Sequence, residues 1–476
     1  MNTKKIISAI IAMSIIVSLT ACASDGGEAD VTTTTQMTVE IKTEELSEED
    51  ASAIKSTAEE LLTGELENKT IKWFSFYDPF HATTSGNTKS LSLELFETQY
   101  GGEIEYIPTT WSNRFNDMST KIIGGEGIDF VAGGDLDSFP KGVVNGMFDS
   151  FDQYIDFDNQ IWSGIKSLND YFELNGKHYL ICTQATEGQV VYYNRNTIES
   201  MGFDDPADLL KDGNWTWDSF KNMLLDFCDV DGEQYGLDGW FNEQPIMLTC
   251  GVPSVELKDG KLVHNFNDPA IERSMLFMND LFTNGLVLDK NLFNWNTHIE
   301  YIGEGKELFY ISGLYELNAD TEIWTKTFGD PEDVMFVPLP KDPNADAYYL
   351  PAGLEAFMLC KGAQNPEGVM KFMECSIVAN TDERTIQIGN DKLRNDFGWT
   401  EDMIEMAQTI KDLTKEHPMY DIHAGCPTDM YNLIDSGETG IRAALQGADW
   451  AVTRETLIDA IQTYIDEFNE SVKEIA

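Results

Sequence analysis

Short apolar runs alternate with helical patterns along most of this chain. Apolar runs of strand length cover 71–76, 103–107 and 128–132, and helical periodicity covers 91–100 and 111–123. Alternating strands and helices predict a largely parallel sheet that is covered by helices. Because the loops after parallel strands gather at one edge of such a sheet, we expect the residues that follow these strands to lie close together.

The segment 176–227 carries two strand patterns in tandem. A turn at Gly176 leads into an apolar strand over 179–182, and a polar break at 183–189 precedes a second strand over 190–193. The sequence therefore predicts two consecutive strands with a short bendable crossing between them.

Strand and helix patterns continue to the end of the chain, and they are marked by capping residues and apolar faces. The predicted strands lie within 302–317, 334–340 and 350–359, and the predicted helices begin or lie at 196–202, 216–227, 268–285, Asn365, 400–416, 439–445 and 453–468.

The first 22 residues have the three parts of a secretory signal. Lys4 and Lys5 precede an apolar run over 6–17, which is too short to span a bilayer, and small residues follow. The end of this segment, Leu19-Thr20-Ala21-Cys22, resembles the bacterial lipobox. That resemblance implies cleavage before Cys22 and a diacylglyceryl group on its thiol, which would anchor the protein stably to a membrane.

The region 23–68 is rich in Thr, Ser, Asp and Glu, with thirteen acidic residues against two lysines. Such a composition buries too little apolar surface to fold, so we expect an acidic flexible tether. Within it, 47–62 has a capping start and an apolar stripe, which predicts a short amphipathic helix. This helix is either the first docked element or a part of the tether.

The whole chain is strongly acidic, with 32 basic and 82 acidic side chains. Loss of Lys4 and Lys5 with the signal changes the net charge from −50 to −52. This balance argues against nucleic acid and an anionic membrane surface as partners, because both need basic patches. About 400 residues follow the tether. A single hydrophobic core usually supports fewer residues than this, so two lobes are expected.

The sequence contains no recognisable catalytic or metal-binding motif. Phosphate-binding loop, nucleophile-elbow and zinc-protease motifs are absent, and the six histidines are scattered. Apart from Cys22, the six cysteines are irregularly spaced and form no Cys-x-x-Cys pair, which favours buried free thiols while leaving a bridge open. We therefore expect no cofactor, no metal and no enzymatic activity.

The order of motifs from Gly176 onward resembles the middle of the family 1 extracellular solute-binding proteins. It runs Gly-Lys-x-Tyr, apolar strand, polar crossing, Tyr-Asn-Arg, short helix, Gly-Phe, Asp-Pro and Trp-Thr-Trp-Asp. The run 122–131 is similar to the helix, Gly-x-x-Pro-Asp and apolar strand of that family, although Ile128 stands where Pro is usual. The segment 302–317 is similar to its Gly-Lys strand, and the resemblance covers 69–476.

The resemblance implies an α/β fold of the type II periplasmic-binding-protein kind. Each lobe would be a mostly parallel sheet flanked by helices, and hinge strands near 184–189 and 353–359 would join the lobes. The implied division is a signal peptide at 1–22, the tether at 23–68, lobe 1 at 69–186 with 358–425, and lobe 2 at 187–357 with 426–476.

Side chains at the predicted strand ends are the candidate ligand-binding residues. Aromatic rings stack on the apolar faces of sugars, and carboxylates accept hydrogen bonds from their hydroxyls, so this mixture suits a carbohydrate. Instead of binding a ligand, Asp135 could be a solvated turn residue and Trp240 could be a core residue. The candidates are Tyr77, Asp78, Trp111, Asp135 and Glu187 from lobe 1 and the crossing, with Trp240, Tyr315 and Glu355 from lobe 2.

The resemblance implies a lipid-anchored, extracytoplasmic, monomeric protein that captures a sugar or oligosaccharide and delivers it to the permease of an ABC importer. Its mechanism would be hinge closure over the ligand. A binding protein for a peptide, a polyamine or another small solute is one alternative. A secreted carbohydrate-active enzyme is another, which turnover of oligosaccharides by the purified protein would reveal.

Overall fold

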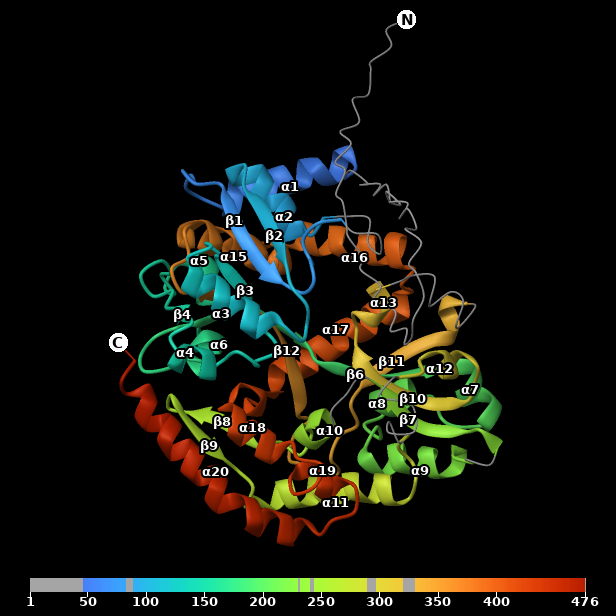
Figure 1. The fold of residues 1–476 in the computed structure, drawn as a ribbon. Coiled ribbons are helices and arrows are strands. Elements are labelled where there is room, and N and C mark those ends of the chain that lie inside the picture. The colour runs from blue at the N-terminus through green and yellow to red at the C-terminus, as the bar shows by residue number, and fades with distance from the viewer. Residues whose placement is uncertain are drawn as a thin grey trace, which may run out of the picture.

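The computed structural model describes residues 46–82, 89–229, 232–239, 244–288, 297–319 and 330–475. Over these residues the chain forms two lobes, one built on a seven-stranded sheet and the other on a four-stranded sheet (Figure 1). The expected two-lobe α/β fold is therefore confirmed.

The larger sheet has the strand order β13-β12-β3-β1-β2, and both β4 and β5 also pair with β12. Its strands are β1 (Thr70–Ser75), β2 (Glu103–Pro108), β3 (Phe130–Ala132), β4 (Phe148–Asp149), β5 (Leu180–Glu187), β12 (Leu350–Cys360) and β13 (Pro418–Met419).

The smaller sheet has the order β11-β6-β10-β7, and a separate hairpin is formed by β8 and β9. These strands are β6 (Gln189–Asn194), β7 (Tyr235–Gly239), β8 (Val255–Lys258), β9 (Lys261–His264), β10 (Glu307–Gly313) and β11 (Val334–Pro338).

Both main sheets are mixed rather than mostly parallel, which corrects one detail of the sequence prediction. In the larger sheet β1 pairs in parallel with β2 and β3, but β12 runs antiparallel to β3, β4 and β5. In the smaller sheet β10 is parallel to β7 and antiparallel to β6. The antiparallel pairs arise because β12 and β6 enter each sheet directly from the other lobe rather than through a helical crossover.

The two lobes are linked by a strand that continues further than its sequence suggested. The polar stretch 183–189 was expected to break the strand, yet β5 runs to Glu187 and β6 begins at Gln189. The backbone of β5 pairs with β12 from Leu180↔Met358 to Glu187↔Ala352, with a register shift at Thr183, and the side chains from Gln184 to Glu187 are half-buried. Only Gly188 separates the strands, and a Cβ at this position would lie 2.5 Å from the Pro351 carbonyl oxygen.

Helices cover both lobes and form most of the lower left of the molecule in Figure 1. Their bounds are α1 (Glu48–Leu61), α2 (Leu91–Tyr100), α3 (Arg114–Gly124), α4 (Lys141–Val144), α5 (Gln160–Ser163), α6 (Lys166–Tyr171), α7 (Arg195–Met201), α8 (Pro206–Lys211), α9 (Trp217–Phe227), α10 (Gln244–Leu248), α11 (Pro269–Thr283), α12 (Glu300–Gly303), α13 (Glu316–Ala319), α15 (Pro366–Thr381), α16 (Glu383–Phe397), α17 (Glu401–Glu416), α18 (Thr428–Ile434), α19 (Ile441–Leu445) and α20 (Trp450–Val472).

The amphipathic helix expected at 47–62 is a docked element. It forms α1, which begins at the Ser47 cap and packs against α2 and α16. Ile54 and Ala58 on its inner face are buried, and Thr57 donates a hydrogen bond to Asp382. Of the two alternatives that the sequence left open, the structure therefore supports a helix docked on the lobe that contains the seven-stranded sheet.

An aromatic core underlies one face of the larger sheet and fixes the positions of its strand ends. Trp73 of β1, Phe130 of β3 and Phe357 of β12 are almost fully buried and contact one another with ring centroids 4.9 to 6.0 Å apart. Phe372 of α15 packs against the same group. Close packing of large rigid rings leaves the residues that follow β1 and β3 little freedom to move.

The six cysteines from Cys182 to Cys426 are free thiols, and all but Cys228 are buried. This confirms the expectation of buried thiols over a disulfide framework. Across the part of the chain that the structure describes, no helix combines the length and the apolar composition that a bilayer crossing requires.

Candidate functional site

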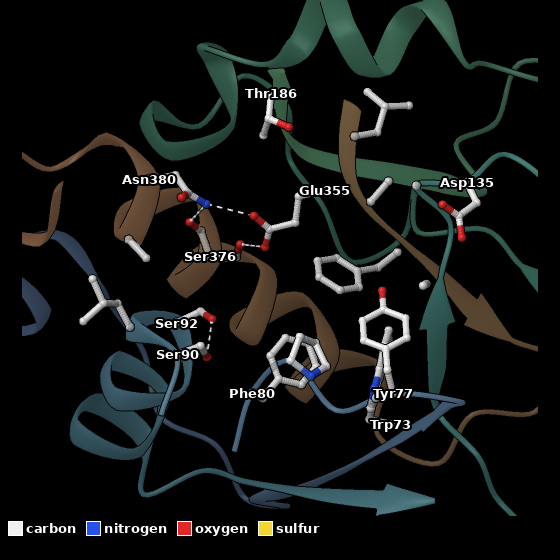
Figure 2. A pocket seen from close by; sticks show the side chains of 18 residues that line it. Trp73, Tyr77, Phe80, Ser90, Ser92, Asp135, Thr186, Glu355, Ser376 and Asn380 are labelled. Carbon is white, nitrogen blue, oxygen red and sulfur yellow. Dashed lines mark hydrogen bonds between the residues drawn. The ribbon is translucent and has the colours of Figure 1, made fainter. Parts of the chain in front are cut away.

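A cavity of about 450 Å³ lies at the edge of the larger sheet where β1 and β3 end (Figure 2). Its walls come from these strands, from β5 and β12, and from α2 and α15. The volume falls within the roughly 300–1,000 Å³ of typical small-molecule sites. The loops after β1 and β3 complete the lining, so all of it belongs to the seven-stranded sheet, its helices and the loops between them.

Tyr77 is the aromatic side chain of the cavity that remains accessible. Its backbone carbonyl accepts a hydrogen bond of 3.1 Å from the Trp73 indole, which holds the loop after β1 in place. Its side chain is 42% exposed, whereas those of Trp73 and Phe80 are 1% and 4% exposed. Partial burial of the Tyr77 hydroxyl raises its pKa, and the nearby carboxylates of Asp135 and Glu355 add to this shift. The hydroxyl therefore stays neutral and retains a proton to donate.

Asp135 reaches the cavity because the loop after β3 passes very close to β12. A Cβ at Gly134 would lie 2.1 Å from the Leu354 carbonyl oxygen, so only glycine allows this approach. Burial raises the pKa of Asp135, the neighbouring Asp137 adds to the increase, and Arg114 opposes it. The Asp135 side chain stands at the cavity wall in Figure 2 and is exposed enough to meet a ligand.

Glu355 is held rigidly at the cavity by three hydrogen bonds from other elements. Its carboxylate accepts bonds from Gln184 of β5 at 3.2 Å, from Asn380 of α15 at 2.9 Å, and from the Ser376 hydroxyl. The Gln184 amide oxygen in turn accepts a bond from Lys411 of α17. Glu355 was expected from the second lobe, but it lies on β12 and faces the cavity of the first.

Ser376 and Asn380 are site residues that sequence analysis missed. They stand four residues apart on α15, whose sequence is otherwise mostly apolar at this end, so they share one helix face. Two polar residues at this spacing at the otherwise mostly apolar end of a helix were the sequence signal that could have identified them. Ser90, Ser92 and Thr186 also line the cavity and were not among the candidates.

Asp78 and Trp111 lie outside the cavity wall. The carboxylate of Asp78 accepts bonds from the backbone N–H groups of Phe80 and His81 and lies 2.8 Å from the His81 ring, so it stabilises its own loop. These bonds outweigh burial and lower the pKa of Asp78. Trp111 contacts Phe76 and Arg114 instead.

Glu187 and Tyr315 do not line the cavity: Glu187 lies at the crossing between the sheets, and Tyr315 follows a strand of the four-stranded sheet. Glu187 ends β5 opposite Ala352, and burial raises the pKa of its carboxyl, although Lys411 opposes this. Tyr315 follows β10, and its side chain is 58% exposed. Partial burial of the Tyr315 hydroxyl raises its pKa, and the charges of Glu316 and Asp135 add to this shift, while a hydrogen bond with Ser312 opposes it.

Cys22 and Trp240 fall outside the described residues, so both remain predictions from the sequence.

The chemistry of the lining limits what this cavity can hold. It presents the carboxylates of Asp135 and Glu355, the Tyr77 ring, and several hydroxyl and amide groups. None of the described lining residues is a lysine, an arginine or a histidine. Such a site can accept many hydrogen bonds from a neutral or cationic ligand and offers no cation to a phosphate or a carboxylate.

Comparison with known proteins gives one family match. The family model for the bacterial extracellular solute-binding protein matches residues 82–376, which is more than half of the chain. A search of curated proteins finds no match to this sequence.

Several solved structures share the fold. An ABC substrate-binding protein from Listeria monocytogenes in complex with cycloalternan aligns with a TM-score of 0.60 at 14% identity, covering 84% of this chain and 100% of that one. The cyclic alpha-maltosyl-1,6-maltose binding protein from Arthrobacter globiformis gives a TM-score of 0.59 at 13% identity, covering 85% and 100%. An extracellular solute-binding protein from Staphylococcus aureus in complex with maltose gives 0.55 at 13% identity, covering 85% and 99%.

Proposed function

Since this chain belongs to the bacterial extracellular solute-binding proteins, we propose that it captures a sugar or short oligosaccharide and delivers it to an ABC importer. The observation that carries the proposal is the combination in one cavity of an accessible aromatic ring, Tyr77, with two carboxylates, Asp135 and Glu355. A sugar stacks an apolar face on such a ring and donates its hydroxyl protons to such acceptors.

The ligands of similar structures support a sugar over other solutes. Cycloalternan, cyclic maltosyl-maltose and maltose are the molecules that the proteins described above bind. A polyamine is the competing ligand, since the absence of basic lining residues suits a cation as well.

Closure over the ligand would occur at the strands that cross between the lobes. Gly188, between β5 and β6, and the long strand β12 are the proposed hinge elements. Tyr315 of the smaller lobe would then close against Asp135 of the larger one. The division of the chain into lobe 1 at 69–186 with 358–425 and lobe 2 at 187–357 with 426–476 remains part of this proposal.

A thermal-shift panel on the protein lacking residues 1–22 tests the function. The panel contains mono- and oligosaccharides, spermidine and a tripeptide. A ligand at 100 times its Kd raises the stability by about 2.7 kcal/mol, which is easily detected. Stabilisation by a sugar, with compaction of the sugar complex in X-ray scattering, is the expected result. Stabilisation by spermidine or the peptide alone, or release of shorter sugars during incubation, would contradict the proposal.

Ligand affinity should fall on acidification because of Asp135. Its raised pKa means that it takes up a proton at a higher pH than an ordinary aspartate, and the protonated form is a poorer acceptor. Calorimetry between pH 7 and pH 4 should show this loss in the wild type. In Asp135→Asn the affinity should already be low at pH 7 and should change less with pH. An equal pH dependence in both proteins would assign the titration to another group.

We propose further that Cys22 carries a lipid that holds the protein on the extracytoplasmic face of the cell membrane. Replacing Cys22 with Ala removes the only thiol at the lipobox-like site. The variant should therefore appear in the medium or remain uncleaved, as fractionation and immunoblotting would show. Detergent-dependent membrane association equal to that of the wild type would rule out the anchor.

A further inference from the structure

Three exposed aromatic side chains form a continuous strip beside the cavity. Phe76, Tyr77 and Trp111 are 37%, 42% and 52% exposed, and among the described residues the only other large aromatic side chain that is as exposed is Tyr315. The Phe76 ring lies 4.8 Å from that of Tyr77 and 5.0 Å from that of Trp111, measured between centroids. Exposed apolar surface gathered in one patch marks a binding surface more often than scattered residues do.

The strip is continuous with the cavity at one end. Tyr77 lines the cavity, and Phe76 follows β1 directly and lines a small neighbouring hollow together with Asp135. Trp111 extends the strip to the loop after β2. A ligand whose first unit occupies the cavity would therefore meet Phe76 and Trp111 as it leaves.

The outer end of the strip is fixed in orientation before any ligand arrives. The Arg114 guanidinium lies 3.5 Å from the Trp111 ring centroid and donates a hydrogen bond to the Trp111 carbonyl oxygen. Arg114 is itself held by an ion pair of 2.7 Å with Asp137. Such a clamp on an exposed indole restricts the rotamers of the free protein, which reduces the entropy cost of stacking a ligand on it.

We propose that Phe76 and Trp111 form an outer subsite that stacks the sugar units beyond the first, so that the ligand is an oligosaccharide of at least three units. This inference rests on the proposed function, because it takes the cavity as the place of the first unit. It assigns to Phe76 a role that its sequence position did not suggest, and it makes Arg114 a positioning residue for Trp111.

The test is calorimetric affinity along two length series, from glucose to maltotetraose and from glucose to cellotetraose. For the series that binds, wild-type affinity should rise at least about tenfold from the disaccharide to the tetrasaccharide. Trp111→Ala should lose about five- to tenfold in affinity for the tetrasaccharide and stay within about twofold for the disaccharide, whereas Phe76→Leu should lose about five- to tenfold for both and stay within about twofold for glucose. Leu276→Ala, which removes an equally exposed apolar side chain from α11, is the matched control and should bind as the wild type does.

Several outcomes separate the two hypotheses. If no sugar of the thermal-shift panel and no member of either series binds, the proposed function itself is overturned; if only a monosaccharide binds, the outer subsite is wrong while the function stands. If sugars bind with an affinity that does not depend on length, or if Trp111→Ala weakens every length equally, the outer subsite is wrong while the function stands. Arg114→Lys keeps the charge but loses the planar contact, so it should weaken tetrasaccharide binding less than Trp111→Ala does, with an unchanged melting temperature.

Discussion

Replacing Asp129 with Ala is expected to lower the free energy of unfolding by about 3 to 5 kcal/mol. Asp129 is 1% exposed, and its carboxylate accepts backbone N–H bonds from Lys72 at 2.9 Å, Gln364 at 2.6 Å and Asn365 at 3.1 Å. It thereby joins β1, the start of β3 and the beginning of α15, three elements that lie far apart in the sequence. Alanine would leave the N–H groups of Lys72, Gln364 and Asn365 without this acceptor, and that of Asn365 is buried.

Urea or thermal unfolding measures this effect against two comparison variants. Asp129→Asn keeps one acceptor oxygen and loses the charge, so its destabilisation should be intermediate. Glu105→Ala removes an exposed carboxylate from the neighbouring strand β2 and should change the stability by less than about 0.5 kcal/mol. A loss below 1 kcal/mol for Asp129→Ala would mean that water or a rearranged backbone satisfies the three donors.

Asp129 also shows how far the sequence alone could lead. The run around it was recognised as a strand signature, and β3 lies within the predicted strand, because apolar runs between glycine turns report local structure directly. The role of the carboxylate could not be predicted, since two of its three partners come from the loop after β12, more than 230 residues away in the sequence. Hydrogen bonds across such distances leave no local pattern.

The hinge region and the helix after α15 show where local patterns fail. The half-polar composition of 183–189 indicated a break, yet pairing with β12 keeps Gln184 to Glu187 in a strand, and only Thr183 lies at a register shift. Tertiary pairing here overrides the local composition. Helix α16 was not predicted, because only Thr385 and Ile388 among its residues are buried and Gly389 interrupts the pattern.

For the candidate site, the sequence predicted which strand ends contribute residues better than it predicted the hydrogen-bond partners of those residues. Tyr77 and Asp135 were found because residues after parallel strands meet at one sheet edge, and the structure brings both to one cavity. Asp78, one residue further along, turns away to stabilise its loop, which depends on the side-chain geometry of His81. Ser376 and Asn380 reach the cavity only because α15 packs beneath β12.

Replacing Glu355 with Ala should weaken ligand binding by about ten- to a hundredfold, or roughly 1.5 to 3 kcal/mol. Three donors, from Gln184, Ser376 and Asn380, hold this carboxylate in one place at the cavity. A fixed charged acceptor forms stronger bonds to ligand hydroxyls than a mobile one, because less side-chain entropy is lost on binding. The half-buried position of Glu355 should let the variant fold.

Calorimetry with the best ligand of the panel distinguishes direct contact from positioning. In Glu355→Gln the new amide group can donate a hydrogen bond to the Ser376 hydroxyl, which can accept as well as donate, so the side chain can keep its place. This variant therefore measures the loss of the charge alone. Asn380→Ala leaves the charge and loosens the carboxylate, and we expect a loss of about three- to tenfold from it. Glu105→Ala again serves as the control for an exposed acid. If Glu355→Ala binds with native affinity while its melting temperature is unchanged, the ligand does not contact this wall, and the binding site has to be sought on the side of Tyr315 and the smaller sheet.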